Sequence, residues 1–151
     1  TLLSRMPIFP IYYEGNTKFM PIHVSDLTEV IFFVIDKKIN SMTIECVGNE
    51  IITFKEVLRR LLKLIDKKRI LIPLPLIIAK LSSKFLQKFP KPLITEDQLR
   101  LLAYDNVTSG DYKTNFDLGI TNKAVFDKEV EKYCFMWREA GQFSTNKYTK
   151  N

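Results

Sequence analysis

The chain has 151 residues, of which 46% are hydrophobic and 26% charged, and its formal net charge at pH 7 is +6. These proportions are typical of soluble globular proteins and exclude a chain that is disordered throughout. The length fits one domain built around one core. We therefore predict a single domain over residues 1–141, followed by a polar, disordered tail at residues 142–151.

Membrane-spanning, secreted and metal-binding classes are not favoured. The longest mostly apolar run, residues 70–81, holds two prolines and is shorter than the roughly 20 residues of a membrane-spanning helix. The start, TLLSRMPIFP, lacks the pattern of a secretory signal, and its first residue is Thr, which favours a fragment of a longer protein. Cys46 and Cys134 have no CxxC spacing and the chain contains one His, so we expect buried thiols rather than a disulfide, no metal site and a cytoplasmic location.

The positive charge is regional. Residues 55–100 contain twelve Lys or Arg and four Asp or Glu, a net charge of +8, so the remainder is slightly acidic. Such a region suits phosphate groups, an anionic membrane surface or an acidic partner protein. The sequence does not rank these three.

Two elements are predicted in the first third of the chain. The turn-like EGNT at residues 14–17 precedes the extended KFMPIHV, which predicts a short hairpin or a loop followed by a strand. Asp26 lies three residues before Glu29, the spacing of a capping box, so we expect a helix with Asp26 as its N-cap. Its apolar face is predicted to hold Leu27, Val30, Ile31, Val34 and Ile35.

The middle of the chain alternates between strand and helix patterns. Residues 42–48, MTIECVG, predict a strand, and a capping box at Thr53 and Glu56 opens a helix that ends near Asp66. The buried face of that helix is predicted to hold Val57, Leu58, Leu61, Leu62 and Ile65. An extended stretch at residues 70–75 follows.

A third helix is predicted at residues 76–89, ended by Pro90 and Pro92. Its apolar side holds Leu81, Phe85 and Phe89, and its basic side holds Lys80, Lys84 and Lys88, with Lys91 just beyond. This layout suits a helix that lies on a membrane or partner surface, although an ordinary solvated helix face has the same layout.

The last third predicts a short helix after a capping box at Thr95 and Gln98, turns at residues 104–111, and a final helix over residues 123–140. The inward side of the final helix is predicted to hold Phe126, Val130, Tyr133 and Trp137. The predicted fold class is therefore α+β, dominated by helices, with at most three or four short strands.

Motifs of cofactor binding and catalysis are absent. The sequence contains no GxGxxG, GxxxxGK[ST], HExxH or GxSxG, and none of its tyrosines has a lysine four residues later. We therefore assign no catalytic, cofactor-binding or metal-binding residue to this chain. His23, the only histidine, is interpreted as a partly buried ring at a cleft wall rather than as a general base, because no second His or nucleophile is near it in sequence.

An ordered series of segments resembles a known family. The segments are GNTKFMPIHVSDL, ECVGNEIITFKEVLRRLL, ILIPLPLIIAKL, LITEDQLRLLAYDNVTSGD and DLGIT, within residues 15–120. IHVSDL resembles the part of extended short-chain dehydrogenase/reductases in which a strand after the Rossmann core runs into a helix and lines the substrate cleft. The whole series is most similar to the atypical branch that includes the complex I 39-kDa subunit.

This resemblance implies that the chain is the C-terminal substrate- and partner-binding half of a larger protein. The N-terminal Rossmann half, absent from this chain, would bind NAD(P)(H). The resemblance places Ile22, His23, Val24 and Asp26 along the substrate cleft, with Asn106 and Ser109 as a second wall. It also implies an accessory, structural role in the NADH:quinone oxidoreductase.

The resemblance also implies two kinds of partner, complex I subunits or an anionic membrane surface. The chain would contact them through Lys80, Lys84, Lys88 and Lys91. The location would then be peripheral on the inner membrane, on the matrix side if the protein is mitochondrial. Without the Rossmann half, we expect an exposed apolar patch on the helix of Leu27 or the strand of Met42, and a homodimer of the fragment is one way to cover it.

Two other functions are weighed. The full protein could be an NAD(P)-dependent reductase or epimerase that acts in quinone metabolism or on a nucleotide-linked sugar. A basic nucleic-acid-binding domain would need only the positive charge, but the aromatic residues lie at core spacing rather than between the basic ones. We therefore expect no nucleic-acid partner.

Overall fold

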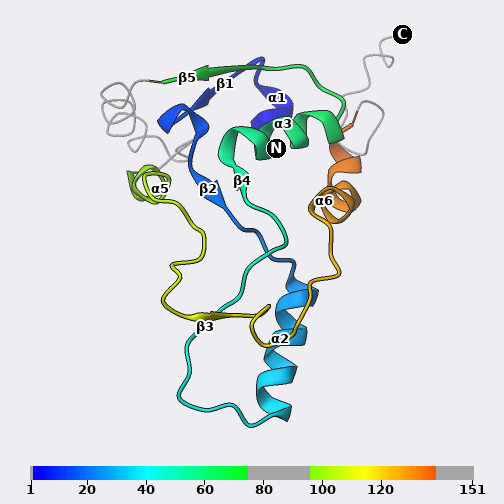
Figure 1. The fold of residues 1–151 in the computed structure, drawn as a ribbon. Coiled ribbons are helices and arrows are strands. Elements are labelled where there is room, and N and C mark those ends of the chain that lie inside the picture. The colour runs from blue at the N-terminus through cyan, green and yellow to red at the C-terminus, as the bar shows by residue number, and fades with distance from the viewer. Residues whose placement is uncertain (1, 75–95, 139–151) are drawn as a thin grey trace.

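The computed structural model describes residues 2–74 and 96–138, and it has a mixed α+β architecture, as the sequence predicts (Figure 1). Its helices are α1 (Leu2–Arg5), α2 (Val24–Asp36), α3 (Phe54–Leu64), α5 (Glu96–Leu101) and α6 (Phe126–Cys134), with 3-10 turns η1 (Tyr13–Gly15) and η2 (Phe135–Trp137). Its strands are β1 (Ile8–Ile11), β2 (Lys18–Phe19), β3 (Ile44–Glu45), β4 (Ile52–Thr53), β5 (Ile70–Pro73) and β6 (Lys113–Thr114).

The described residues contain six short strands, so the prediction of at most three or four is wrong, and the six form three two-stranded sheets. β1 pairs with β5 and β3 with β6 in parallel, whereas β2 pairs with β4 in antiparallel orientation. The predicted hairpin is therefore wrong, and the alternative of a loop followed by a strand is correct. Tyr13, Glu14 and Gly15 all have positive φ angles, so the chain turns away after β1 and β2 meets the distant β4 instead.

The main core lies between α3 and the β1–β5 pair. Thr53 caps α3 as predicted, since its Oγ1 accepts a hydrogen bond from the backbone N–H of Glu56 at 3.2 Å. The buried apolar side chains of this core are Leu3, Ile11, Leu58, Leu62, Ile65 and Cys134. The predicted buried face of α3 is thus confirmed for Leu58, Leu62 and Ile65.

The two-stranded sheet of β1 and β5, called the ribbon below, has one inner and one outer face. Phe9, Ile11 and Leu71 face inward and pack on the α3 core. Side chains alternate along each strand, so Ile8 and its partner Ile70 share the other face with Ile72. The exposed fractions of Ile8, Ile70 and Ile72 are 47%, 63% and 41%.

Within the part of the chain that the structure describes, the ribbon has two unpaired edges, and each carries a proline. The N–H groups of Ile70 and Leu74 donate to the carbonyls of Pro7 and Ile11, so these residues face the partner strand. Because the N–H direction alternates, Pro73 on β5 and Pro10 on β1 face outward. Proline has no N–H, so neither edge offers a complete ladder to a further strand.

The final helix is shorter than predicted, and its buried side differs in part from the predicted one. α6 begins at Phe126 rather than Lys123, and η2 continues from its end to Trp137. Val130 and Trp137 pack against the core as predicted. Tyr133 is instead exposed and Cys134 takes the buried position, so the inward placement of Tyr133 is wrong.

The predictions for β3 and α5 are correct only in part, and several other predictions cannot be compared with the structure. The strand at residues 42–48 is reduced to the two residues of β3. In α5, Leu99 is buried but Leu101 is exposed. The helix at residues 76–89, Pro90, Pro92, Thr95, the four lysines Lys80, Lys84, Lys88 and Lys91, and the tail at residues 142–151 lie outside the described residues.

Candidate functional site

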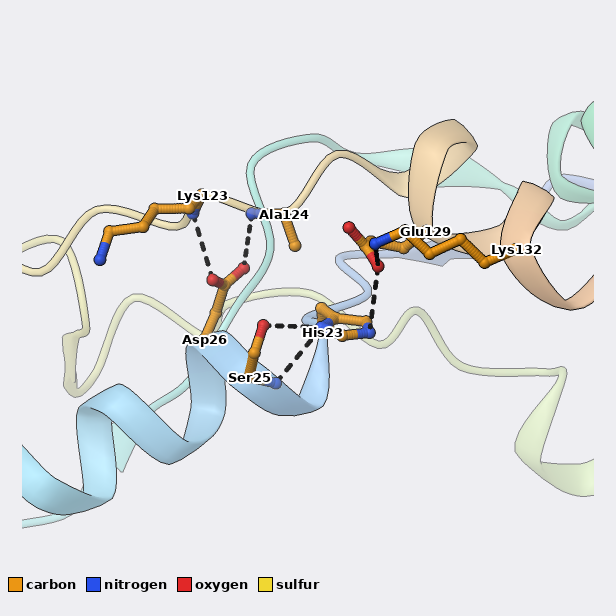
Figure 2. A network of polar contacts seen from close by, with 7 residues as sticks. All are labelled: His23, Ser25, Asp26, Lys123, Ala124, Glu129 and Lys132. Carbon is orange, nitrogen blue, oxygen red and sulfur yellow. Dashed lines mark hydrogen bonds and ion pairs between the residues drawn. The ribbon is translucent and has the colours of Figure 1, made fainter.

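The start of α2 differs from the prediction. His23 is the N-cap, since its Nδ1 accepts from the backbone N–H of Ser25 at 3.3 Å and lies 2.7 Å from Ser25 Oγ (Figure 2). The predicted N-cap role of Asp26 is therefore wrong. Asp26 lies within the first turn of the helix, where a negative charge is also favourable, and its side chain is used elsewhere.

Asp26 connects α2 to the segment before α6. Its Oδ1 accepts from the backbone N–H of Lys123 at 3.2 Å and its Oδ2 from that of Ala124 at 3.1 Å (Figure 2). Only 3% of Asp26 is exposed. A buried carboxylate is tolerated when its oxygens are hydrogen-bonded, and here each oxygen has a backbone donor. Glu29, one turn later, accepts from Lys123 Nζ at 2.7 Å.

His23 faces α6 with its other ring nitrogen. Nε2 lies 3.7 Å from Glu129 Oε2, and the same carboxylate oxygen accepts from Lys132 Nζ at 2.6 Å (Figure 2). The hydrogen bond from Lys132, helped by the charge of Lys132, lowers the pKa of Glu129 below its usual value. Glu129 is therefore an anion that faces the imidazole, with Nδ1 of His23 as the acceptor for Ser25 and Nε2 on the side of the carboxylate.

A pocket of about 240 Å³ opens between these residues and the loop after β3. Its lining residues are Pro21, His23, Asp26, Gly48, Asn49, Glu50, Asn122, Ala124, Val125 and Phe126. Gly48 is required at its wall, because a Cβ there would lie 1.9 Å from the carbonyl oxygen of Pro21. Gly48 also donates its backbone N–H to Met20. The loop after β3 thus lies directly against the segment that precedes α2.

Three asparagine side chains connect the loop after β3 to the segment before α6. Asn115 is fully buried, and its Oδ1 accepts from the backbone N–H of Val47 at 2.8 Å. Asn122 receives a hydrogen bond from Asn115 Nδ2 and donates to the carbonyl of Val47 at 2.7 Å. Asn49 Nδ2 donates to the carbonyls of Asn122 and Ala124. These bonds tie residues 47–49 to residues 115–124.

The acidic rim of the pocket is neutralised by Arg60 of α3. Arg60 donates to both oxygens of Glu50, at 2.7 and 2.8 Å, and to Glu56 at 2.7 Å. The paired hydrogen bonds from Arg60 lower the pKa of Glu50. The guanidinium also lies 5.9 Å from the centre of the Phe126 ring, at a distance that suits a cation–π contact.

The ionisable side chains that line this pocket include His23, Asp26 and Glu50. Both oxygens of Asp26 and both oxygens of Glu50 are held by protein donors, and the lining contains no Ser, Thr, Cys, Tyr or Lys side chain.

The predicted cleft residues divide between two pockets. His23 and Asp26 line the first pocket, whereas Ile22 and Asn106 line a second one of about 360 Å³ on the other side of Pro21. The other residues of the second pocket are Met20, Pro21, Glu45, Cys46, Val47 and Val107.

Val24 and Ser109 line neither of these two pockets. The side of α2 that carries Val24 is exposed, and the backbone N–H of Ser109 donates to the carboxylate of Glu45 at 3.1 Å. The assignment of all six residues to a substrate cleft stays a prediction.

The outer side of α2 is an exposed apolar surface. Val24, Ile31, Phe32 and Ile35, called the α2 outer face below, are 66%, 51%, 68% and 67% exposed. The prediction of an exposed apolar patch on this helix is confirmed, and Met42 is also exposed. Val30, on the opposite side, is buried. The prediction that Ile31 and Ile35 lie on the inner side is wrong, because both residues are exposed and lie on the same side of the helix as Val24.

Sequence reasoning missed Glu129, Asn115, Asn122 and Arg60. Glu129, Asn115 and Asn122 meet the site across a long stretch of chain, and Arg60 meets Glu50 across ten residues, and no local motif signals these contacts. Among the residues described, no group of three or more His, Cys, Asp or Glu side chains is placed to hold a metal ion. Likewise, no helix in residues 2–74 or 96–138 is long and apolar enough to cross a membrane.

Comparison with known proteins adds no relative. No family model matches the sequence, and no curated protein matches it at a significant level.

Proposed function

We propose that this chain is the C-terminal part of an NAD(P)-binding atypical short-chain dehydrogenase/reductase, of the kind that includes the complex I 39-kDa subunit, with an accessory structural role. A separate Rossmann half holds the nucleotide, and this part provides a docking helix and a pocket wall. The observation that carries the proposal is the α2 outer face.

α2 is apolar on two opposite sides. Its inner side packs on the protein through Val30 and the bonds of Asp26, while the α2 outer face is exposed. Helices that are apolar all round are normally covered on all sides. A contiguous exposed apolar patch commonly marks an interface with another domain or protein. The Rossmann half that the sequence resemblance calls for would supply this cover.

The position of α2 suits this role. The helix starts directly after the segment PIH, which lines both pockets, and it extends away from the α3 core at one end of the molecule (Figure 1). A domain docked on the α2 outer face would lie beside both pockets. Since the carboxylates of the first pocket are held by protein donors, binding and positioning are favoured over proton transfer.

The proposal is tested on the protein captured from its own cells through this segment. Denaturing mass spectrometry measures the intact mass, and nucleotide released from the native material is quantified. We expect a mass larger by about 150 residues, or a stoichiometric nucleotide-binding partner chain, together with bound NAD(P)(H). A mass near 17.7 kDa without nucleotide would refute the proposal.

A paired set of variants locates the interface. Replacing Phe32 and Ile35 by Ser removes apolar side chains from the α2 outer face, and we expect the recovery of bound nucleotide to fall. Replacing Ile70 and Ile72 by Ser changes an exposed apolar face at the other end of the molecule and serves as the control. If the two double variants retain equal amounts of bound nucleotide, the α2 outer face is not needed for nucleotide binding.

A further inference from the structure

A hydroxyl group and an imidazole ring are in contact at the start of α2. Ser25 Oγ lies 2.7 Å from His23 Nδ1, a distance at which a hydroxyl donates a hydrogen bond to a ring nitrogen (Figure 2). Ser25 is exposed, whereas His23 is partly buried. The interpretation that no nucleophile is near His23 in the sequence is therefore wrong, because Ser25 follows it by two positions.

Helix capping accounts for only one of the two contacts between these residues. The capping hydrogen bond joins the backbone N–H of Ser25 to His23 Nδ1 and makes no use of the serine hydroxyl. Thr28, which carries the next hydroxyl of α2, donates to the carbonyl of Val24, as hydroxyl groups within helices commonly do. The hydroxyl of Ser25 contacts the imidazole instead.

Glu129 of α6 faces the other nitrogen of the ring. Its Oε2 lies 3.7 Å from His23 Nε2, and the hydrogen bond from Lys132 favours the ionised carboxylate. An anion on the Nε2 side favours the tautomer that carries its proton on Nε2. The lone pair of Nδ1 is then directed to Ser25, in agreement with the hydrogen bond that Nδ1 accepts from the backbone.

This order of groups is typical of an activated nucleophile. A serine hydroxyl attacks a carbonyl carbon effectively when a neighbouring base takes its proton and a third group supports the base. The anionic Glu129 would stabilise the positive charge that the imidazole gains in that step. Ser25 also lies in the first turn of α2, where backbone N–H groups without partners in the helix favour a negative charge on the attacked oxygen.

We propose that Ser25 takes the acyl group of a small carboxylic ester and passes it to water, with His23 as the base. As Oγ bonds to the carbonyl carbon, its proton moves to Nδ1. The bond from that carbon to the alcohol oxygen then breaks, and the alcohol leaves with the proton. Water attacks acyl-Ser25 in the same way and releases the carboxylic acid. Ser25 lines neither pocket described above, so the substrate class is an ester that needs no enclosing site.

The test treats the 151-residue chain with a fluorophosphonate, which forms a stable bond with activated serines, and locates the adduct by peptide mass spectrometry. We expect the adduct on Ser25, and Ser41, which is also exposed, serves as the internal reference. Turnover is measured with p-nitrophenyl acetate. This activity does not depend on the nucleotide-binding role proposed above.

Three variants separate an activated hydroxyl from a helix cap. His23→Asn removes the base but retains a residue that caps helices well, and the rates of labelling and turnover should fall about 100-fold. Ser25→Ala keeps the backbone N–H that bonds to His23 and should abolish turnover. The matched control is Thr28→Ala, which removes the other hydroxyl of α2 and should leave both rates unchanged.

Glu129 is a positioning residue in this scheme, because it faces His23 rather than the ester. Glu129→Gln should lower kcat by at least about tenfold and leave KM unchanged. Glu131→Gln is its control, since this carboxylate is on the same helix but pairs with Arg138.

Two outcomes would overturn the proposal. The first is that Ser25 is labelled no faster than Ser41. The second is that His23→Asn labels Ser25 as fast as the unchanged chain does, which would show that the imidazole does not activate the hydroxyl. Labelling of His23→Asn decides the question even if Ser25→Ala fails to fold.

Discussion

Asp26 and Ala124 lie 98 positions apart in the sequence, yet the backbone N–H of Ala124 donates to Asp26 Oδ2 at 3.1 Å. The neighbouring N–H of Lys123 donates to the other oxygen. This pair of bonds fixes the first turn of α2 against the segment that leads into α6. The segment at residues 123–124 is thereby held beside α2, just before α6 begins at Phe126.

Replacing Asp26 by Asn should destabilise the protein by about 2–3 kcal/mol. The amide keeps one acceptor oxygen, but its NH₂ group then faces a backbone N–H without an acceptor, and the charge that strengthens both bonds is lost. Urea denaturation would measure the change. Glu29→Gln is the control, because Glu29 is exposed and pairs with Lys123 at the surface, so it should change stability by less than about 1 kcal/mol. Equal effects of the two variants would contradict this account.

The elements with strong local signals were predicted correctly. The capping pair Thr53 and Glu56, followed by the apolar spacing of Leu58 and Leu62, identified α3 and its buried face. These signals depend on residues that are close in the sequence, and in α3 the tertiary packing agrees with them.

The site itself required long-range contacts that the sequence does not display. Asp26 and Glu29 have the spacing of a capping box, but a side chain that caps a helix and one that bonds to a distant backbone have the same sequence signature. Here His23 is the N-cap, and the carboxylate of Asp26 accepts hydrogen bonds from the backbone of residues 123 and 124. Its partner segment and Glu129 of α6 could not be identified without the tertiary fold.

Replacing Gly48 by Ala should cost about 2–3 kcal/mol, in the range of substitutions that force backbone shifts. The new Cβ would lie 1.9 Å from the Pro21 carbonyl oxygen, and backbone atoms cannot move away as a flexible side chain can. The control is Gly110→Ala. Gly110 has a φ of +84° and open space around its Cβ position, so only the backbone cost of about 1 kcal/mol is expected. Thermal or urea unfolding would rank the two, and a larger effect at Gly110 would be evidence against close packing at Gly48.

The Arg60–Glu50 pair predicts how stability depends on acid. Because the hydrogen bonds from Arg60 lower the pKa of Glu50 in the folded state, the unfolded chain takes up this proton first as the pH falls. The stabilising contribution is present above the unfolded pKa, near 4.5, and is lost as the pH falls through the lower folded value. Urea denaturation from about pH 6 to about pH 3 should show a shallower acid decline for Glu50→Gln than for the unchanged chain. Identical declines would show that this pair does not contribute.

The prolines at the ribbon edges predict an effect on association. In the double variant Pro10→Val, Pro73→Val, both outward positions gain an N–H, and each edge can then pair with another strand. We expect the variant to form dimers or larger aggregates at concentrations where the unchanged chain stays monodisperse, as measured by size-exclusion chromatography with light scattering. Ile70→Val is the matched control, because the N–H of residue 70 already bonds to Pro7 within the ribbon and the substitution adds no edge donor. If the proline variant elutes like the control, an edge other than the ribbon, or a side-chain surface such as the α2 outer face, governs self-association.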